Sequence, residues 1–182
     1  ITPVARLTAV NIGGVVISNA TLHNFDEIEK KDICEGDTVE IQRAGDVIPQ
    51  VLKVVKKEKN RKKIIKPPSL CPVCGSKTMK EKDEAVIRCT NSISCDAQNL
   101  GGLIHFVSKK SFNIEGLGEK QISQFYNLNF IKNFEDIFYI NRHKKIILDL
   151  EGWGELSFQN LIKSIEKSKS IALDKFIFSL GI

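Results

Sequence analysis

The sequence of 182 residues lacks a long hydrophobic run, and no stretch approaches the roughly 18 apolar residues that a transmembrane helix needs. No signal peptide precedes its cysteines either. The sequence therefore predicts a soluble, cytoplasmic chain with reduced cysteines and no membrane partner. It also lacks an initiator Met and stops directly after an apolar helical stretch, so we expect a fragment of a longer protein.

Cysteine is scarce, with five in the chain. Four of them fall within 25 residues, at Cys71, Cys74, Cys89 and Cys95. The first pair belongs to Cys-Pro-Val-Cys-Gly, in which Gly75 allows a tight turn that directs both sulfurs to one point. The second pair completes the group after a short intervening segment. Four thiolates with this spacing predict a tetrahedral, structural Zn²⁺ site with no open position.

Two other interpretations of these thiols compete with zinc. Disulfides require an oxidising compartment and would leave Cys34 unpaired. A redox-active Cys-x-x-Cys motif explains Cys71 and Cys74 but leaves Cys89 and Cys95 without a role. Zinc uses all four thiols, and a segment with so few apolar residues is not expected to fold without its metal.

The formal net charge of +5 permits a nucleic-acid partner without requiring one. Residues 53–66 carry eight Lys or Arg against a single acidic residue, Glu58. Such a run is typical of a solvated linker or an exposed strand pair. It also fits a non-specific surface for phosphate contacts, whose contribution would fall with salt. Pro67 and Pro68 then stiffen the entry to the four-cysteine segment.

The first 55 residues alternate between short strands and turns. Strands are expected over residues 4–10, 15–17, 38–43 and 47–55, and a short helix over 22–31. Within the last of these strands Pro49 must lie at an edge or a bulge, because it has no amide hydrogen to donate. Four to five strands and one helix in this length predict a small Greek-key β-barrel of the OB type.

The last third of the chain repeats itself. Asn-Ile-Glu-Gly-Leu-Gly-Glu at 113–119 returns 36 residues later as Asp-Leu-Glu-Gly-Trp-Gly-Glu at 149–155. Each copy precedes a helical pattern, and a duplicated Gly-apolar-Gly between helices is typical of helix-hairpin-helix repeats. Leu117 and Trp153 are expected to anchor the two hairpins. Further helices are expected over residues 103–109, 134–140 and 171–180.

The glycines of the repeat would bring a phosphate close to the amides that open each following helix. These candidate DNA-binding residues are Gly116, Gly118, Gly152 and Gly154. Contact with the DNA backbone rather than with base edges predicts binding that is independent of DNA sequence.

Short motifs occur along the whole chain. They are Thr-Pro-Val-Ala-Arg at 2–6, Ser-Asn-Ala-Thr-Leu-His-Asn at 18–24, Arg-Ala-Gly-Asp-Val-Ile-Pro-Gln-Val at 43–51, Cys-Pro-Val-Cys-Gly at 71–75, Arg-Cys-Thr at 88–90, Cys-Asp-Ala-Gln at 95–98, His-Phe-Val-Ser at 105–108 and Leu-Gly-Ile at 180–182. These motifs resemble those of bacterial NAD⁺-dependent DNA ligases. Each motif alone is weakly specific, whereas their order and spacing together are specific.

The resemblance implies a multidomain α+β chain in a fixed order. An OB barrel with its basic exit segment would occupy residues 1–66, and a four-cysteine zinc finger would occupy 67–98. An all-α helix-hairpin-helix domain would follow over 99–182, truncated at its C-terminal end. In the barrel, the resemblance places Arg43 on the DNA backbone, and Val47 and Ile48 in the minor groove beside a nick. From the residues alone, at least one of these two aliphatic side chains would belong to the core.

The resemblance also implies an enzyme that seals nicks between 5′-phosphate and 3′-hydroxyl ends of duplex DNA in replication and repair. That chemistry uses NAD⁺ and Mg²⁺ and needs an adenylation domain with a Lys-x-Asp-Gly nucleophile, a motif that this sequence does not contain. We therefore expect this chain to be the DNA-clamping portion of a bacterial, nucleoid-associated ligase. It should be inactive without its adenylation domain in cis. The expected partner is nicked double-stranded DNA. The alternative is a non-catalytic DNA-binding module of a repair or recombination scaffold.

Overall fold

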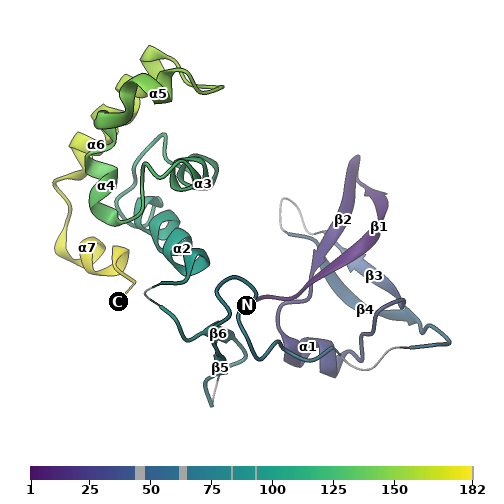
Figure 1. The fold of residues 1–182 in the computed structure, drawn as a ribbon. Helices are drawn as coiled ribbons and strands as arrows, with labels where there is room; N and C mark the ends of the chain where they lie inside the picture. Colours follow the sequence, from purple (N-terminus) through teal and green to yellow (C-terminus); the bar gives the residue numbers. More distant parts are fainter. Residues whose placement is uncertain (44–47, 62–64, 83, 93, 182) are drawn as a thin grey trace. The chain divides into compact units, whose positions relative to one another are not determined.

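The computed structural model describes residues 1–43, 48–61, 65–82, 84–92 and 94–181. The chain divides into two compact units, Ile1–Asn91 and Ser92–Ile182 (Figure 1). The division into three domains at residues 66 and 98 stays a prediction. Among the described residues, no helix is long and apolar enough to cross a membrane.

The first unit is built around a four-stranded sheet with the order β1-β2-β4-β3. The strands are β1 (Val4–Ile12), β2 (Val15–Thr21), β3 (Thr38–Gln42) and β4 (Gln50–Lys56). β1 and β2 form the predicted antiparallel hairpin. Its two-residue turn is Gly13-Gly14, both at positive φ (+58° and +81°), which suits the right-handed twist of the flanking strands. β3 and β4 are also antiparallel, whereas β2 meets β4 in parallel at Thr21 and Gln50.

A small core lies beneath this sheet, where helix α1 (Phe25–Lys30) packs at one end (Figure 1). The helix begins at Asn24, whose side-chain oxygen accepts the Glu27 amide at 2.8 Å. Its Ile28 is fully buried and belongs to a cluster with Ala20, Leu22, Ile33 and Val51. Alternating positions of the strands thus supply one face of the core, as their sequence pattern predicts.

β4 begins later than the sequence indicates, at Gln50 rather than at residue 47. Pro49 precedes the strand, and its carbonyl oxygen accepts the Thr21 amide at 2.7 Å. A proline at this place costs the sheet no donor, because only its carbonyl takes part in the pairing. Val47 lies outside the described residues.

The four-cysteine segment contributes a second, two-stranded sheet of β5 (Thr78–Lys80) and β6 (Ile87–Cys89) to the first unit. Two contacts tie this hairpin to the preceding residues. The Ile1 amino group donates to the Ile87 carbonyl at 2.5 Å, and Lys80 Nζ lies 2.6 Å from the Asp26 carboxylate at the start of α1.

The second unit is helical. Its elements are α2 (Asp96–Val107), α3 (Glu119–Asn127), α4 (Phe134–Phe138), the 3₁₀ turn η1 (Ile140–His143), α5 (Lys144–Leu148), α6 (Glu155–Ser168) and α7 (Leu173–Ser179). Its core contains fully buried aromatic and aliphatic side chains from each helix from α2 to α6, among them Leu103, Phe125, Ile137, Ile147 and Leu161. The tyrosine of α3, Tyr126, donates its hydroxyl to Asp96 at 2.6 Å and so joins α3 to the start of α2.

The helices of the second unit differ from the sequence-based expectation in several places. α2 begins at Asp96, seven residues before the expected start at 103, and Cys95 occupies its N-cap position. The helix expected over 134–140 ends at Phe138, and a separate 3₁₀ turn follows it. α5 was not expected, since five residues are too few to display a helical period.

Candidate functional site

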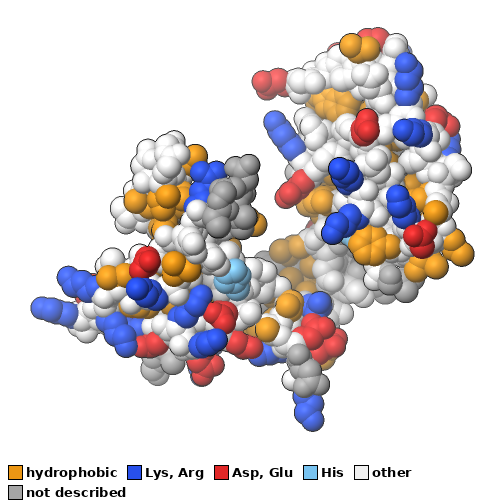
Figure 2. Space-filling view, turned by 180° about the vertical axis from the view of Figure 1, so that it is seen from behind, with side chains coloured by type: hydrophobic (Ala, Val, Ile, Leu, Met, Phe, Trp, Pro, Cys, Tyr) orange, Lys and Arg blue, Asp and Glu red, His pale blue; other side chains and the backbone are white. Residues whose placement is uncertain are grey.

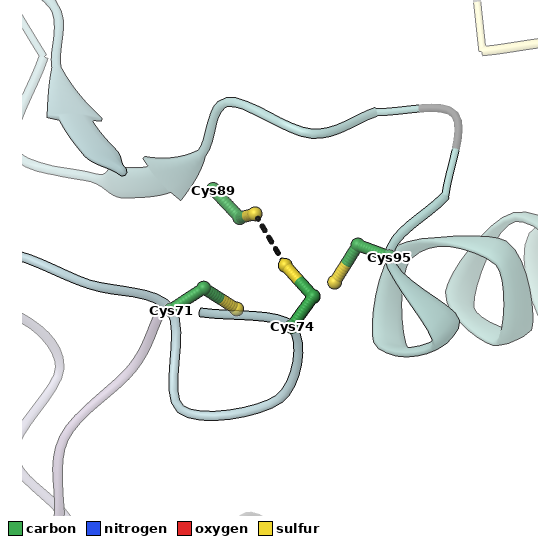
Figure 3. A group of neighbouring side chains, drawn as sticks. All are labelled: Cys71, Cys74, Cys89 and Cys95. Carbon is green, nitrogen blue, oxygen red and sulfur yellow. Dashed lines mark hydrogen bonds between the residues drawn. The ribbon is translucent and has the colours of Figure 1, made fainter. Parts of the chain in front are cut away.

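The side chains of Cys71, Cys74, Cys89 and Cys95 converge on one point (Figure 3). Their sulfur atoms all lie within 4.8 Å of one another. The first two come from the turn before β5, the third ends β6, and the fourth precedes α2. The two outer cysteines of the set, Cys71 and Cys95, are buried, at 6% and 0% exposure.

The turn that carries Cys71 and Cys74 is closed by its own backbone. The Cys71 carbonyl accepts the Gly75 amide at 2.9 Å, and the Cys71 amide donates to the Ser76 carbonyl at 2.7 Å. Gly75 has φ +71°, a left-handed conformation that strains a residue with a Cβ atom. This glycine therefore allows the turn that the Cys-x-x-Cys-Gly sequence predicts.

The distances between the sulfurs fit one tetrahedral ion. Cys74 and Cys89 Sγ are 3.4 Å apart, too far for a disulfide bond of about 2.05 Å, and all five cysteines are free thiols. Sulfurs around a tetrahedral zinc with bonds of about 2.3 Å lie about 3.8 Å from one another. Four sulfurs within 4.8 Å are close to that arrangement. Because all four positions are filled by thiols, the donor set suits a closed, structural site.

The pKa values of these thiols also favour a bound cation. Amide groups of Cys74 and Val73 hydrogen-bond to Cys71 and lower the pKa of its thiol, which favours the thiolate. At Cys89 the Asn91 amide, 3.4 Å from the sulfur, also lowers the pKa, but burial and the neighbouring thiols outweigh it and raise the pKa to about 11. Four crowded thiols cannot all ionise side by side unless a cation compensates their charge.

The structure describes two of the three barrel residues expected at DNA. Arg43 follows β3 and is half-buried, and Ile48 lies two residues before β4 with 72% of its side chain exposed. Ile48 is therefore not a core residue. The third, Val47, lies outside the described residues. His23, in the separate ligase-like motif at 18–24, has its Nε2 2.7 Å from the Gln50 side-chain oxygen and so contacts the first residue of β4.

Acidic side chains of the first unit neutralise part of the basic run at 53–66. The sequence alone does not predict these pairs. Lys53 pairs with Glu40 at 3.1 Å, and Lys57 pairs with Asp32 at 2.7 Å. Arg61 contacts both Asp32 and Asp37, at 2.8 and 2.9 Å. These three cations are paired with acidic side chains of the first unit, although the Lys53 and Lys57 side chains remain largely exposed. The sequence does contain several acidic residues between positions 26 and 40, but only the fold shows which of them pair with the basic run.

Charge is spread rather than concentrated on the visible surface. On the face drawn in Figure 2, Lys and Arg side chains cover both units with acidic side chains among them. On this face, charge alone does not mark a nucleic-acid interface.

The two glycine turns of the second unit have the same backbone geometry at an offset of 36 residues. Gly116 and Gly152 have φ values of +91° and +84°. The next residues, Leu117 and Trp153, donate their amides to the carbonyls three residues earlier, at 3.2 and 3.1 Å. Leu117 is buried and Trp153 packs against the same core, as expected for anchors of the turns. The repeat read from the sequence is thus a repeat of local structure.

The turns differ at the glycine that precedes each helix. The Gly154 amide donates to Ser157 Oγ at 2.9 Å, whereas the Gly118 amide has no acceptor within the described part of the chain. Each glycine is followed by a glutamate at the helix start. Lys144, 2.7 Å from Glu155, neutralises the second of these and lowers the pKa of its carboxyl group.

Comparison with known proteins assigns families to the first unit. Residues 1–63 match the family model described as the NAD-dependent DNA ligase OB-fold domain. Residues 71–97, which contain the four cysteines, match the NAD-dependent DNA ligase C4 zinc finger domain.

Curated relatives match the whole chain. A DNA ligase of Gluconobacter oxydans is 49% identical over 182 residues, one of Afipia carboxidovorans 52% over 189, and one of Wolbachia pipientis 49% over 186. In each comparison all of this chain is covered, but only 27%, 26% and 28% of the relative. The chain thus spans about a quarter of the length of these relatives. With the two domain matches, these identities show that the chain belongs to the NAD-dependent DNA ligases.

Proposed function

We propose that this chain is the DNA-binding portion of an enzyme that seals nicks between 5′-phosphate and 3′-hydroxyl ends in duplex DNA. One observation carries the proposal. Four thiols converge on a single point, and in the sequence they lie between an OB-fold domain and a helical unit with two matching glycine turns. Binding modules in this order suit a protein that encloses a duplex, because an OB fold and the helix N-termini after glycine turns can each contact a nucleic acid.

Zinc has a structural role in this proposal. Cys71, Cys74, Cys89 and Cys95 would hold one Zn²⁺, since their spacing and crowded thiols fit a closed tetrahedral set. Bound there, the ion would fix the turn before β5, the end of β6 and the start of α2 in one place. The small β5-β6 hairpin has little core of its own, so metal binding supplies much of its folding free energy.

In the first unit, Arg43 would contact a phosphate of the DNA, and Ile48 and Val47 would lie against the minor groove beside the nick. The exposure of Ile48 supports this role, because an aliphatic side chain that is 72% exposed contributes little to the core. An apolar side chain in the minor groove is a known means of distorting or widening the duplex. Distortion at a break suits an enzyme that must align two DNA ends.

In the helical unit, the two turns would be helix-hairpin-helix motifs that hold phosphates of the DNA strands. A Cβ atom at Gly152 or Gly154 would meet nothing within 4 Å, so the backbone there is open to a ligand. Amides at the start of α3 and α6 would donate to the phosphate oxygens. Such contacts carry no sequence information, in keeping with a ligase that acts at any nick.

The activity requires parts outside this chain. An adenylation domain in cis would take AMP from NAD⁺ with the help of Mg²⁺, and this chain would close around the nicked duplex in the bacterial cytoplasm, at the nucleoid. Residues 1–66, 67–98 and 99–182 would be its three binding domains.

The proposal is tested with the zinc-loaded chain and fluorescent duplexes that are identical except for one nick. We expect measurable binding of both duplexes, tighter binding of the nicked one, and no radioactive adduct after incubation with NAD⁺ labelled in its adenylate. A stable AMP-protein adduct would refute the assignment of this chain to the binding portion, and absence of duplex binding at low salt would refute its DNA partner.

A further inference from the structure

A cavity of about 520 Å³ opens in the second unit between the first glycine turn, α6 and the start of α7. Asn113 and Glu115, just before Gly116, line one side of it. One stripe of α6 lines another side, because residues three and four apart share a helix face. The size is within the range of ligand-binding sites. Most of the residues that line the cavity have polar or charged side chains.

Three lysines surround the cavity. Lys163 and Lys167 lie one turn apart on α6, and Lys175 lies on α7. Within the part of the chain that the structure describes, none of them is paired with a carboxylate. Two other lysines of this unit do have such partners: Lys144 lies 2.7 Å from Glu155, and Lys169 lies 2.6 Å from Glu166. Three ammonium groups around one hollow favour the binding of an anion there.

The walls of the cavity are joined by a hydrogen bond. The Glu115 amide donates to Ser164 Oγ at 2.7 Å and thereby fastens the glycine turn to α6. Glu115 is the one carboxylate in the lining, so the lining retains two positive charges in excess. Asn160 and Ser170 add further groups that can donate to phosphate oxygens.

We propose that this lysine cavity, lined by Lys163, Lys167 and Lys175, binds a phosphate group of a DNA strand that passes the first glycine turn. The proposal rests on the proposed function and extends it to a contact outside the hairpin glycines. A strand is favoured over a free anion because the cavity is open to solvent and its lining extends from the residues of the glycine turn to α7. Successive phosphates of a strand can contact such a lining, whereas a small anion fills only part of the cavity.

The test compares two double variants of the zinc-loaded chain with equal net charge. Lys163→Gln/Lys167→Gln removes two cations from the cavity. Lys145→Gln/Lys169→Gln removes two exposed cations from the same unit that do not line it. Both changes lower the net charge from +5 to +3. Duplex affinity is measured by fluorescence anisotropy from about 50 to 200 mM salt, with inorganic pyrophosphate as a competitor in a parallel series at constant ionic strength.

We expect the cavity variant to bind duplex DNA about tenfold more weakly at low salt, with a salt slope smaller by about 1 to 2, since each lost phosphate contact removes about 0.9. The decrease in the logarithm of the affinity should be less than half as large in the control variant as in the cavity variant. Equal losses in both variants would overturn the proposal, as would loss of pyrophosphate competition without loss of DNA affinity. Absence of binding by the unmodified chain would instead refute the proposed function.

Discussion

The Arg61 guanidinium lies 2.9 Å from the carboxylate of Asp37, a side chain with no exposed surface. The same carboxylate accepts the amides of Cys34 and Glu58, at 3.0 and 2.9 Å. Burial by itself raises the pKa of Asp37, but these hydrogen bonds outweigh it and lower the pKa. The charge is therefore kept, and Arg61 fastens the segment after β4 to the turn before β3.

The pKa of the neighbouring carboxyl group, Asp32, provides a test of this hydrogen-bond network. Hydrogen bonds from Arg61 and then Lys57 lower the pKa of Asp32 to about 2, against an ordinary value of 3.8. A lowered pKa in the folded state means that the contribution to stability is complete above pH 4 and is lost as the pH falls towards 2. We expect the Asp32 carboxyl to titrate near pH 2 by NMR in the native chain, and closer to 3.8 in Arg61→Gln. An unchanged titration in the variant would contradict the network.

The parts that were predicted correctly depend on local sequence. The β1-β2 hairpin follows from alternation around Gly13-Gly14, and the four cysteines were recognised from their spacing alone. The glycine turns followed from a direct repeat, whose two copies share positive φ at Gly116 and Gly152. Each of these patterns spans few residues and needs no distant partner to form.

The parts that were missed depend on contacts between distant residues. The pairing of Arg61 with Asp37 spans 24 residues, and nothing near either residue identifies its partner. The sequence predicts too late a start for α2, because no local pattern marks Cys95 as its N-cap position. Ile48 and Val47 looked alike in sequence, and the exposure of Ile48 depends on where the chain enters β4.

Replacement of one ligand in the four-cysteine cluster tests the metal site. We expect about one zinc per chain in the native protein by elemental analysis, and loss of that zinc in Cys71→Ser, because three thiolates and a hydroxyl bind Zn²⁺ more weakly. Loss of the metal should unfold residues 67–98, seen as collapse of the β5-β6 amide signals by NMR.

The matched control for the metal site is Cys34→Ser, which changes a buried cysteine outside the cluster. This variant should keep its zinc, even if burial of a hydroxyl lowers its stability by about 1 to 3 kcal/mol. Equal zinc content in native protein and Cys71→Ser would contradict the assignment of the ligands.

Truncation of Ile48 tests the apolar contact at the nick. Ile48→Ala should change the free energy of unfolding by no more than about 0.5 kcal/mol, since the side chain is 72% exposed. Its affinity for nicked duplex should fall several-fold, because an apolar contact with the minor groove is lost. Val16→Ala, at a position 67% exposed on β2, is the control and should bind like the native chain. Equal affinity of all three proteins would exclude Ile48 from the DNA surface.

The two hairpin glycines that precede helices should differ in their importance for DNA binding. Gly118 and Gly154 both have extended backbones, and an added Cβ would meet only the flexible Gln121 side chain at the first and nothing at the second. Alanine at either place should cost about 1 kcal/mol of stability or less. Gly118→Ala should lose more duplex affinity by anisotropy, because the Gly118 amide has no acceptor among the described residues and an added Cβ would obstruct a phosphate there, whereas the Gly154 amide is already bonded to Ser157. The reverse order would mean that the second turn is the main phosphate contact and that the serine hydroxyl yields to it.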